Sequence, residues 1–326
     1  MLNPQAMYDA QQQAAGFVLP QFYNIESTVY QRKYPSFEYE QFMPVVTAGS
    51  EWARGTTFFS GDIAGMANWL SGYGFDMPYA SVSREQFLRA FHLAGVGYEW
   101  NLEEISTAML EGRNMTAEKA DAARQVAQQF LWNIAMTGRN PGAAASEKGW
   151  TGLLNDPNVP AADVPANGTG NVTWWAAKTP DQILDDINAA LDLVVTQSLE
   201  TEMADTVLLP SSQFRLLGQR PRSSTSDTTI LAFLRAHNVY TEQTGRPLNI
   251  RGLRNLETAD PGGDGRMIVY RNDPQVLRFH LPMPHRFLEP FRKGSMTWEV
   301  AGIMRTGGTE IRLPKAMVYR DGIVDN

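Results

Sequence analysis

The segment from residue 42 to residue 98 constrains the fold of this chain most. Strand-like residues from 42 to 59 and from 82 to 98 flank a stretch that is broken by glycines and rich in aromatic residues. This pattern predicts a long two-stranded excursion with a wide tip. Two strands alone are marginally stable in water, and exposed apolar tips usually have a partner. The excursion therefore either packs on its own core, as an ordinary hairpin does, or projects and is covered by another subunit.

Two long helices are expected after this segment. Residues 116 to 137 carry alanines and larger apolar residues on one face at helical spacing, with Thr116 as the N-cap and Gly138 after the last turn. The second helix begins at Thr179, which caps it; Pro180 takes the first helical position and Gln182 completes a capping box. A long helix that is apolar on one side indicates a sheet packed against it.

The C-terminal region reads as a series of strands. Two segments after residue 266 alternate between apolar and polar residues. A third such segment covers residues 309 to 319, and Pro314, Ala316 and the Asp321-Gly322 turn mark its end. A short apolar run at residues 206 to 209 predicts a buried strand between helices. This order of helices followed by strands is typical of an α+β fold.

Composition excludes several classes of protein. The formal net charge is −7, with only six lysines, so the chain as a whole has no electrostatic attraction for a phosphate backbone. The best local basic cluster is Arg215, Arg220 and Arg222, which we interpret as a solvated loop or a subunit contact. The chain has no Cys, which excludes disulfides and Cys-based metal sites. No apolar run approaches the roughly 20 residues that a membrane span needs.

Motifs for catalysis are missing from the sequence. It contains no GxxxxGK[ST], GxSxG or HExxH pattern. His280, His285 and Glu289 could share a metal only through an irregular turn at the intervening prolines. The acidic pairs Asp185-Asp186 and Glu103-Glu104 lie on predicted helices, where adjacent residues do not converge, so we expect solvated faces there. An enzyme whose site is assembled from scattered residues remains an alternative.

The order of elements resembles the major capsid protein of tailed double-stranded DNA bacteriophages, the Hong Kong 97-type capsid fold. The residues that carry the resemblance are those from 149 to 155 (GWTGLLN) after the first long helix, the LLPSSQFRLL stretch, the Arg305-Thr306-Gly307-Gly308 turn, and the strand that ends in Pro314, Lys315 and Ala316. The resemblance implies an N-terminal arm (residues 1–41), an extended loop (42–98), a peripheral domain (99–178 and 273–311) with a spine helix at 116–137, and an axial domain (179–272 and 312–326).

The resemblance also implies a function without enzymatic chemistry or cofactor. The chain would self-assemble into pentamers and hexamers of an icosahedral phage head that encloses packaged double-stranded DNA, in a virion assembled in the host bacterial cytoplasm. Its partners would be copies of itself, a portal, a cement protein and a separate scaffolding protein, with assembly without a scaffolding protein as the alternative. Residues 42 to 98 contain no Lys, so the covalent crosslink of some family members is not expected. The alternatives are an encapsulin-like nanocompartment shell and a soluble α+β enzyme.

Three groups of residues are the expected subunit contacts. Each aromatic among them could instead pack within its own chain. They are the loop residues Trp52, Arg54, Asp62, Trp69 and Tyr73, the arm residues Phe22, Tyr23, Tyr30 and Tyr34, and the basic residues Arg215, Arg220 and Arg222.

Overall fold

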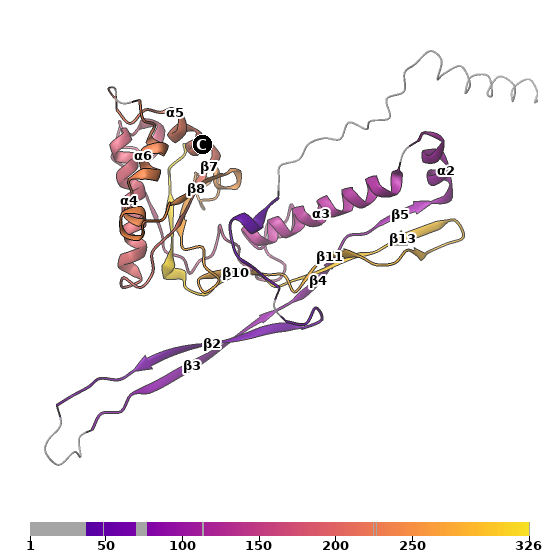
Figure 1. Cartoon of the computed structure of the whole chain (residues 1–326), viewed down its shortest axis with the longest axis horizontal. Helices are drawn as coiled ribbons and strands as arrows, with labels where there is room; N and C mark the ends of the chain where they lie inside the picture. Colours follow the sequence, from indigo (N-terminus) through magenta and orange to yellow (C-terminus); the bar gives the residue numbers. More distant parts are fainter. Residues whose placement is uncertain are drawn as a thin grey trace, which may run out of the picture. The chain divides into compact units, whose positions relative to one another are not determined.

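A computed structural model describes residues 37 to 325 apart from residues 48, 70–76, 113, 224 and 226 (Figure 1). The chain divides into two compact units, which we treat separately. Among the described residues, the smaller unit comprises Gly97–Gln125 and Phe287–Gly302, and the larger comprises Phe37–Val96, Val126–Arg286 and the C-terminal segment from Ile303. No helix in the described part of the chain is both long enough and apolar enough to cross a lipid bilayer.

The smaller unit is built on a three-stranded antiparallel sheet. Strands β12 (Phe291–Arg292), β13 (Thr297–Val300) and β5 (Tyr98–Asn101) lie in that order. Helix α2 (Leu102–Leu110) follows β5 directly, because Asn101 and Glu104 form a capping box.

Helix α3 (Met115–Thr137) occupies the position expected for the first long helix. The predicted cap is wrong: the Asn114 side chain, not Thr116, accepts a hydrogen bond from the Ala117 amide at 3.2 Å. The end is as predicted, with Gly138 at a φ of 69°. Residues 149 to 155 fold back on this end, where Gly152 lies so close that a Cβ would come within 2.2 Å of the Met136 backbone.

A five-stranded sheet organises the larger unit. Its strands lie in the order β6 (Ala161–Asp163), β16 (Met317–Asp321), β9 (Met267–Tyr270), β7 (Thr206–Pro210) and β8 (Asn249–Leu253). Helices α4 (Pro180–Gln197), α5 (Ser211–Gln219) and α6 (Ile230–Ala236) pack on one face, and α7 (Val239–Thr244) follows them (Figure 1). Thr179 and Gln182 form the predicted capping box of α4.

Both faces of this sheet are covered. On β7, Val207 and Leu209 belong to the core beneath the helices, whereas Leu208 belongs to a second core that includes the C-terminal half of α3. All five residues of β7 are therefore buried, as the apolar run at residues 206 to 209 predicts.

The strand expected over residues 309 to 319 is wrong as a single element. The structure divides it into β15 (Gly308–Ile311), a 3₁₀ turn (Pro314–Ala316) and β16. Pro314 has no amide proton and begins the turn, so the chain leaves one sheet and enters another. β15 pairs with β10 (Leu277–His280), which also pairs with β1 (Val45–Val46). The neighbouring sheet has the order β11 (Met283–Phe287), β14 (Gly302–Thr306) and β4 (His92–Gly95).

The expectation that Asp185 and Asp186 form a solvated face is wrong for Asp186. Asp185 is exposed, but Asp186 is 3% exposed and accepts hydrogen bonds from Lys178 Nζ at 2.6 Å and Trp175 Nε1 at 2.9 Å. Neighbouring helical residues point in directions about 100° apart, so one can face the core while the other faces water. Burial raises the pKa of Asp186, and the hydrogen bond from Lys178 opposes that rise.

Candidate assembly surfaces

The predicted excursion is a long hairpin, but it includes fewer residues than expected. Strands β2 (Gly55–Ala64) and β3 (Ser81–Ala90) pair antiparallel along their full lengths, from Gly55 opposite Ala90 to Ala64 opposite Ser81. Residues 42 and 43, which the sequence places in the first strand, are buried in the core of the larger unit. Among the described residues, β2 and β3 hydrogen-bond only to each other as strands, so no third strand extends the hairpin (Figure 1).

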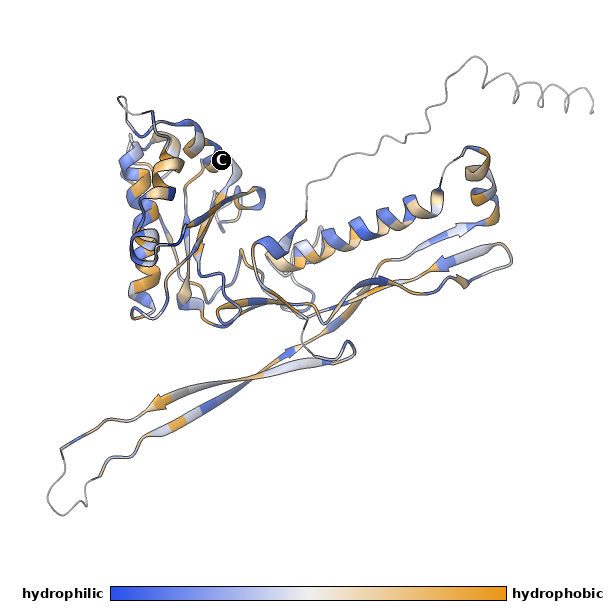
Figure 2. Ribbon diagram, viewed as in Figure 1, coloured by the Kyte–Doolittle hydropathy of each residue, from blue (hydrophilic) through white to orange (hydrophobic). Residues whose placement is uncertain are grey.

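One face of this hairpin carries an exposed apolar stripe. Residues directly opposite in an antiparallel pair share a face, and so do alternate residues along each strand. By that register Phe59, Ile63, Val82 and Leu88 lie on one face, and their exposed fractions are 66%, 78%, 61% and 75%. Figure 2 shows hydrophobic residues along both strands. We call these four residues the apolar stripe.

The segments next to the strands add further exposed apolar residues. Trp69 is 97% exposed, and Met66, Met77 and Tyr79 are also exposed. Trp52, before β2, is 59% exposed, and the Arg54 side chain is exposed as well. Of the other expected contacts on this loop, Tyr73 lies outside the described residues and the Asp62 side chain is not described. The arm residues Phe22, Tyr23, Tyr30 and Tyr34 also lie outside the described part of the chain.

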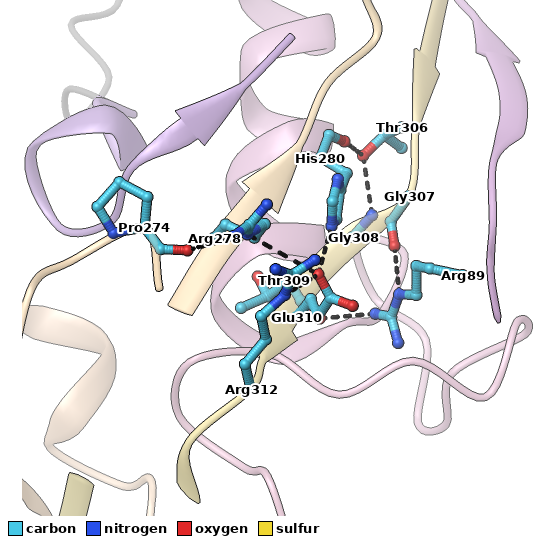
Figure 3. A network of polar contacts seen from close by, with 10 residues as sticks. All are labelled: Arg89, Pro274, Arg278, His280, Thr306, Gly307, Gly308, Thr309, Glu310 and Arg312. Carbon is cyan, nitrogen blue, oxygen red and sulfur yellow. Dashed lines mark hydrogen bonds and ion pairs between the residues drawn. The ribbon is translucent and has the colours of Figure 1, made fainter. Parts of the chain in front are cut away.

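The opposite face of the hairpin is attached to the body at its root (Figure 3). Arg89 on β3 donates from Nε to the Gly307 carbonyl at 2.8 Å and from Nη2 to the Thr309 carbonyl at 2.6 Å. Its guanidinium also lies 5.6 Å from the centre of the Trp150 ring. Burial lowers the pKa of Arg89, while the charges of Glu310 and Asp156 oppose that shift.

The second attachment is the contact of Arg312 with Phe58 on β2, and Glu310 holds Arg312 in place. Its Oε2 atom lies 2.7 Å from His280 Nε2 and 3.2 Å from Arg312 Nε, and Arg278 Nε is 4.0 Å away. Arg312 in turn lies over the ring of Phe58 on β2, at 4.2 Å from the ring centre. Burial alone would raise the pKa of Glu310, but the hydrogen bond from His280 and the charges of His280 and Arg312 outweigh it and lower the pKa.

The Gly307-Gly308 turn makes room for these contacts. A Cβ on Gly307 would lie 2.6 Å from the Phe91 ring, and one on Gly308 would lie 3.0 Å from the Trp150 ring. Gly308 also has a φ of 71°, which favours glycine. The turn is visible in the sequence, but the contacts of Arg89, His280 and Glu310 are not, because their partners lie far away along the chain.

The structure does not bring His280, His285 and Glu289 together as a metal site. The His280 ring nitrogen is used by Glu310, and His285 Nε2 is 3.4 Å from the Val96 carbonyl. In the described part of the chain, no three His, Cys, Asp or Glu side chains are arranged to hold a metal ion.

Of the three basic residues expected on a loop, Arg215 lies on helix α5 and only Arg220 and Arg222 follow it, and they are partly engaged within the chain. Arg220 Nη1 lies 3.5 Å from the Trp175 carbonyl, and Arg222 stacks on Phe233 at 3.7 Å from the ring centre. Arg222 also lies 3.9 Å from a carboxylate oxygen of Asp181. Arg215 is exposed and lines a surface hollow together with Arg220. Of the three, Arg215 is therefore the most available for another molecule.

The subunit is an α+β body with a long hairpin of exposed apolar side chains, an architecture shared with shell-forming proteins. Solved structures of phage capsids have the same fold. The capsid of the myovirus phage XM1 superposes with a TM-score of 0.77 at 15% identity, covering 93% of this chain and 98% of that one. The Microbacterium phage Oxtober96 structure has a TM-score of 0.61 at 10% identity, with 92% and 95% covered. For Gordonia phage Cozz the values are 0.59 and 12%, with 93% and 91% covered.

The family is defined by sequence as well. The family model described as "Major capsid protein" matches residues 65–323, which is most of the chain. No curated protein matches the sequence. The chain belongs to the major capsid protein family, with the Hong Kong 97-like fold that the resemblance implied, and it is a shell protein that associates with copies of itself in the capsid of a virion. These findings favour neither the nanocompartment nor the enzyme alternative.

Proposed function

We propose that this protein forms the pentamers and hexamers of an icosahedral phage head that encloses double-stranded DNA, and that its hairpin lies on a neighbouring subunit. The single observation that carries this proposal is the apolar stripe. Four exposed apolar side chains on one face of a two-stranded ribbon would be unfavourable in water, at about 25 cal/mol for each Å² of apolar surface. A second copy of the chain is the partner that a shell supplies to every subunit.

The domain assignment is part of the proposal. Residues 1–41 would be the arm, residues 42–98 the extended loop, residues 99–178 and 273–311 the peripheral domain, and residues 179–272 and 312–326 the axial domain. Helix α3 would then be the spine helix of the peripheral domain. In this assignment Arg215, Arg220 and Arg222 face neighbours near the ring axis, and Phe22, Tyr23, Tyr30 and Tyr34 anchor the arm on adjacent subunits.

The remaining partners follow from the same proposal. A separate scaffolding protein would guide assembly in the host cytoplasm, and a portal would occupy one vertex. Because residues 42–98 contain no Lys, the mature shell would be held by noncovalent contacts, with a cement protein as reinforcement. The net charge of −7 suits a DNA container, since a strongly basic inner wall would retain DNA and hinder its release. The protein would carry out no enzymatic reaction.

Electron microscopy of the protein, expressed alone and together with its neighbouring genes, tests this function. We expect closed icosahedral particles or free rings of five and six. Phe59→Ser in the apolar stripe and Trp69→Ala near the hairpin tip should each reduce the yield of shells while leaving the subunit folded. Ser60→Thr is the matched control, because residue 60 is exposed on the opposite face of the same strand. A protein that remains a monomer or dimer under every condition would contradict the proposal.

A further inference from the structure

The hairpin has few attachments that could fix the direction in which it leaves the body. No strand of another sheet pairs with β2 or β3 in the described part of the chain, so side chains must supply the attachment. At the base, the Phe91 amide donates to the Arg54 carbonyl at 2.8 Å, which joins the two ends of the hairpin to each other and not to the body.

The two strands are held by different residues. Strand β3 is held through Arg89, whose fork reaches the carbonyl of Gly307 in the β14–β15 turn and that of Thr309 on β15. It is also held through Phe91, which is 5% exposed and lies against Gly307. Strand β2 is contacted through Phe58, on which Arg312 lies. Phe58 also stacks on its cross-strand neighbour Phe87, with the ring centres 5.1 Å apart and the planes 16° from parallel.

These contacts lie on one face of the hairpin. In the register of β2 and β3, Phe58, Phe87 and Arg89 share the face opposite the apolar stripe. Attachment of this face therefore leaves the stripe free for a partner. Two attachments, one to each strand, define both the direction of the ribbon and its rotation about its own axis.

We propose that Arg89 and Arg312 are positioning residues that fix the direction of the hairpin, and with it the orientation of the apolar stripe, before a second subunit is met. This inference rests on the proposed function of the hairpin as a contact between copies. Glu310 positions Arg312 through its carboxylate. His280, on the neighbouring strand β10, makes a hydrogen bond with the same carboxylate oxygen.

A fixed direction matters because of entropy. A hairpin that moves freely loses conformational entropy when it forms a contact between subunits. A hairpin whose direction is already fixed loses less. Each subunit of a shell makes several contacts at once, so a small penalty for each contact multiplies over the particle. Loss of the two attachments should therefore raise the subunit concentration needed for assembly, while the subunit stays folded.

Distance measurements between two spin labels test this inference in the unassembled subunit. The chain has no Cys, so Ser81→Cys at the far end of β3 and Asp192→Cys on α4, both exposed positions of the larger unit, can be labelled without background. We expect a single narrow distance distribution with the two arginines present. Arg89→Lys, which keeps the charge but loses the fork, and Arg312→Met, at a position that is 22% exposed, should each broaden it.

Arg235→Lys on helix α6 is the matched control, because this exposed arginine lies away from the hairpin root. It should leave the distribution narrow. Circular dichroism separates loss of attachment from loss of folding. A distribution that stays narrow in the folded Arg89→Lys and Arg312→Met subunits would overturn the inference. Failure of the unaltered protein to assemble would instead overturn the proposed function and leave the distance result in force.

Discussion

At the scale of single residues, two buried carboxylates show opposite responses to their surroundings. Glu310 has three cationic or ionisable partners within 4.0 Å, and its pKa is lowered despite burial. Asp186 has one lysine and one indole, and burial raises its pKa even though both donate to it. The number and arrangement of donors, and not burial alone, therefore decide which carboxylate stabilises the folded state as an anion.

Glu310 should make the stability of the subunit depend on acid pH. Its folded pKa lies below the ordinary value of 4.5, so its contribution is fully present above about pH 4.5 and is lost as the pH falls through the lowered folded pKa. Glu310→Gln should cost roughly 1–3 kcal/mol in free energy of unfolding at pH 7 and should flatten this part of the pH curve. Urea unfolding at a series of pH values measures both effects. Parallel curves for the variant and the unaltered protein would show that another group causes the dependence.

Lys178 should be among the residues least tolerant of substitution. Its ammonium group is fully buried beside Asp186, and it also donates to the Pro165 carbonyl at 2.8 Å. Lys178→Met would leave the carboxylate without its counter-charge, and breaking a buried pair in this way costs roughly 3–5 kcal/mol. Lys119→Met is the control: that lysine pairs with Glu104 in a partly exposed position and should change the unfolding midpoint far less. Equal effects of the two substitutions would contradict this assignment.

At the scale of elements, the sequence predicts the parts whose signals are local. The capping box at Thr179 and Gln182 lies within one helical turn and is found as predicted. The strand expected over residues 309 to 319 fails at Pro314, because a period-two pattern does not reveal that its two ends belong to different sheets. The hairpin root could not be predicted, since Arg89 and its acceptors are 218 and 220 residues apart.

The hairpin should be among the least protected β elements of the unassembled subunit. Every described residue of β3 except Arg89 is exposed, whereas β7 and β9 are wholly buried. Local opening is easiest where few apolar contacts cover the backbone hydrogen bonds, so amides of β2 and β3 should exchange with deuterium much faster than those of β7. Assembly should slow exchange in the hairpin and leave β7 unchanged. Exchange in the hairpin that is equally fast in assembled particles would contradict burial by a neighbour.

At the scale of the whole molecule, association must overcome like charge. Every copy carries a formal charge of −7, so copies repel one another, while the exposed apolar side chains of the hairpin favour contact. Sodium chloride changes the burial of apolar surface only weakly, whereas repulsion between exposed charges is screened beyond about 10 Å at 0.1 M ionic strength. Salt therefore weakens mainly the repulsion between copies and has much less effect on the apolar contact that favours association.

Sodium chloride should therefore promote assembly. Raising it from about 0.02 to about 0.5 M shortens the Debye length several-fold, so the subunit concentration at which light scattering rises should fall. A variant with Asp185→Asn and Asp192→Asn, both at exposed positions on α4, has a formal charge of −7 + 2 = −5 and should depend less on salt. If salt instead dissolves the particles, ion pairs between subunits outweigh net repulsion, and charge complementarity rather than the apolar stripe holds the shell together.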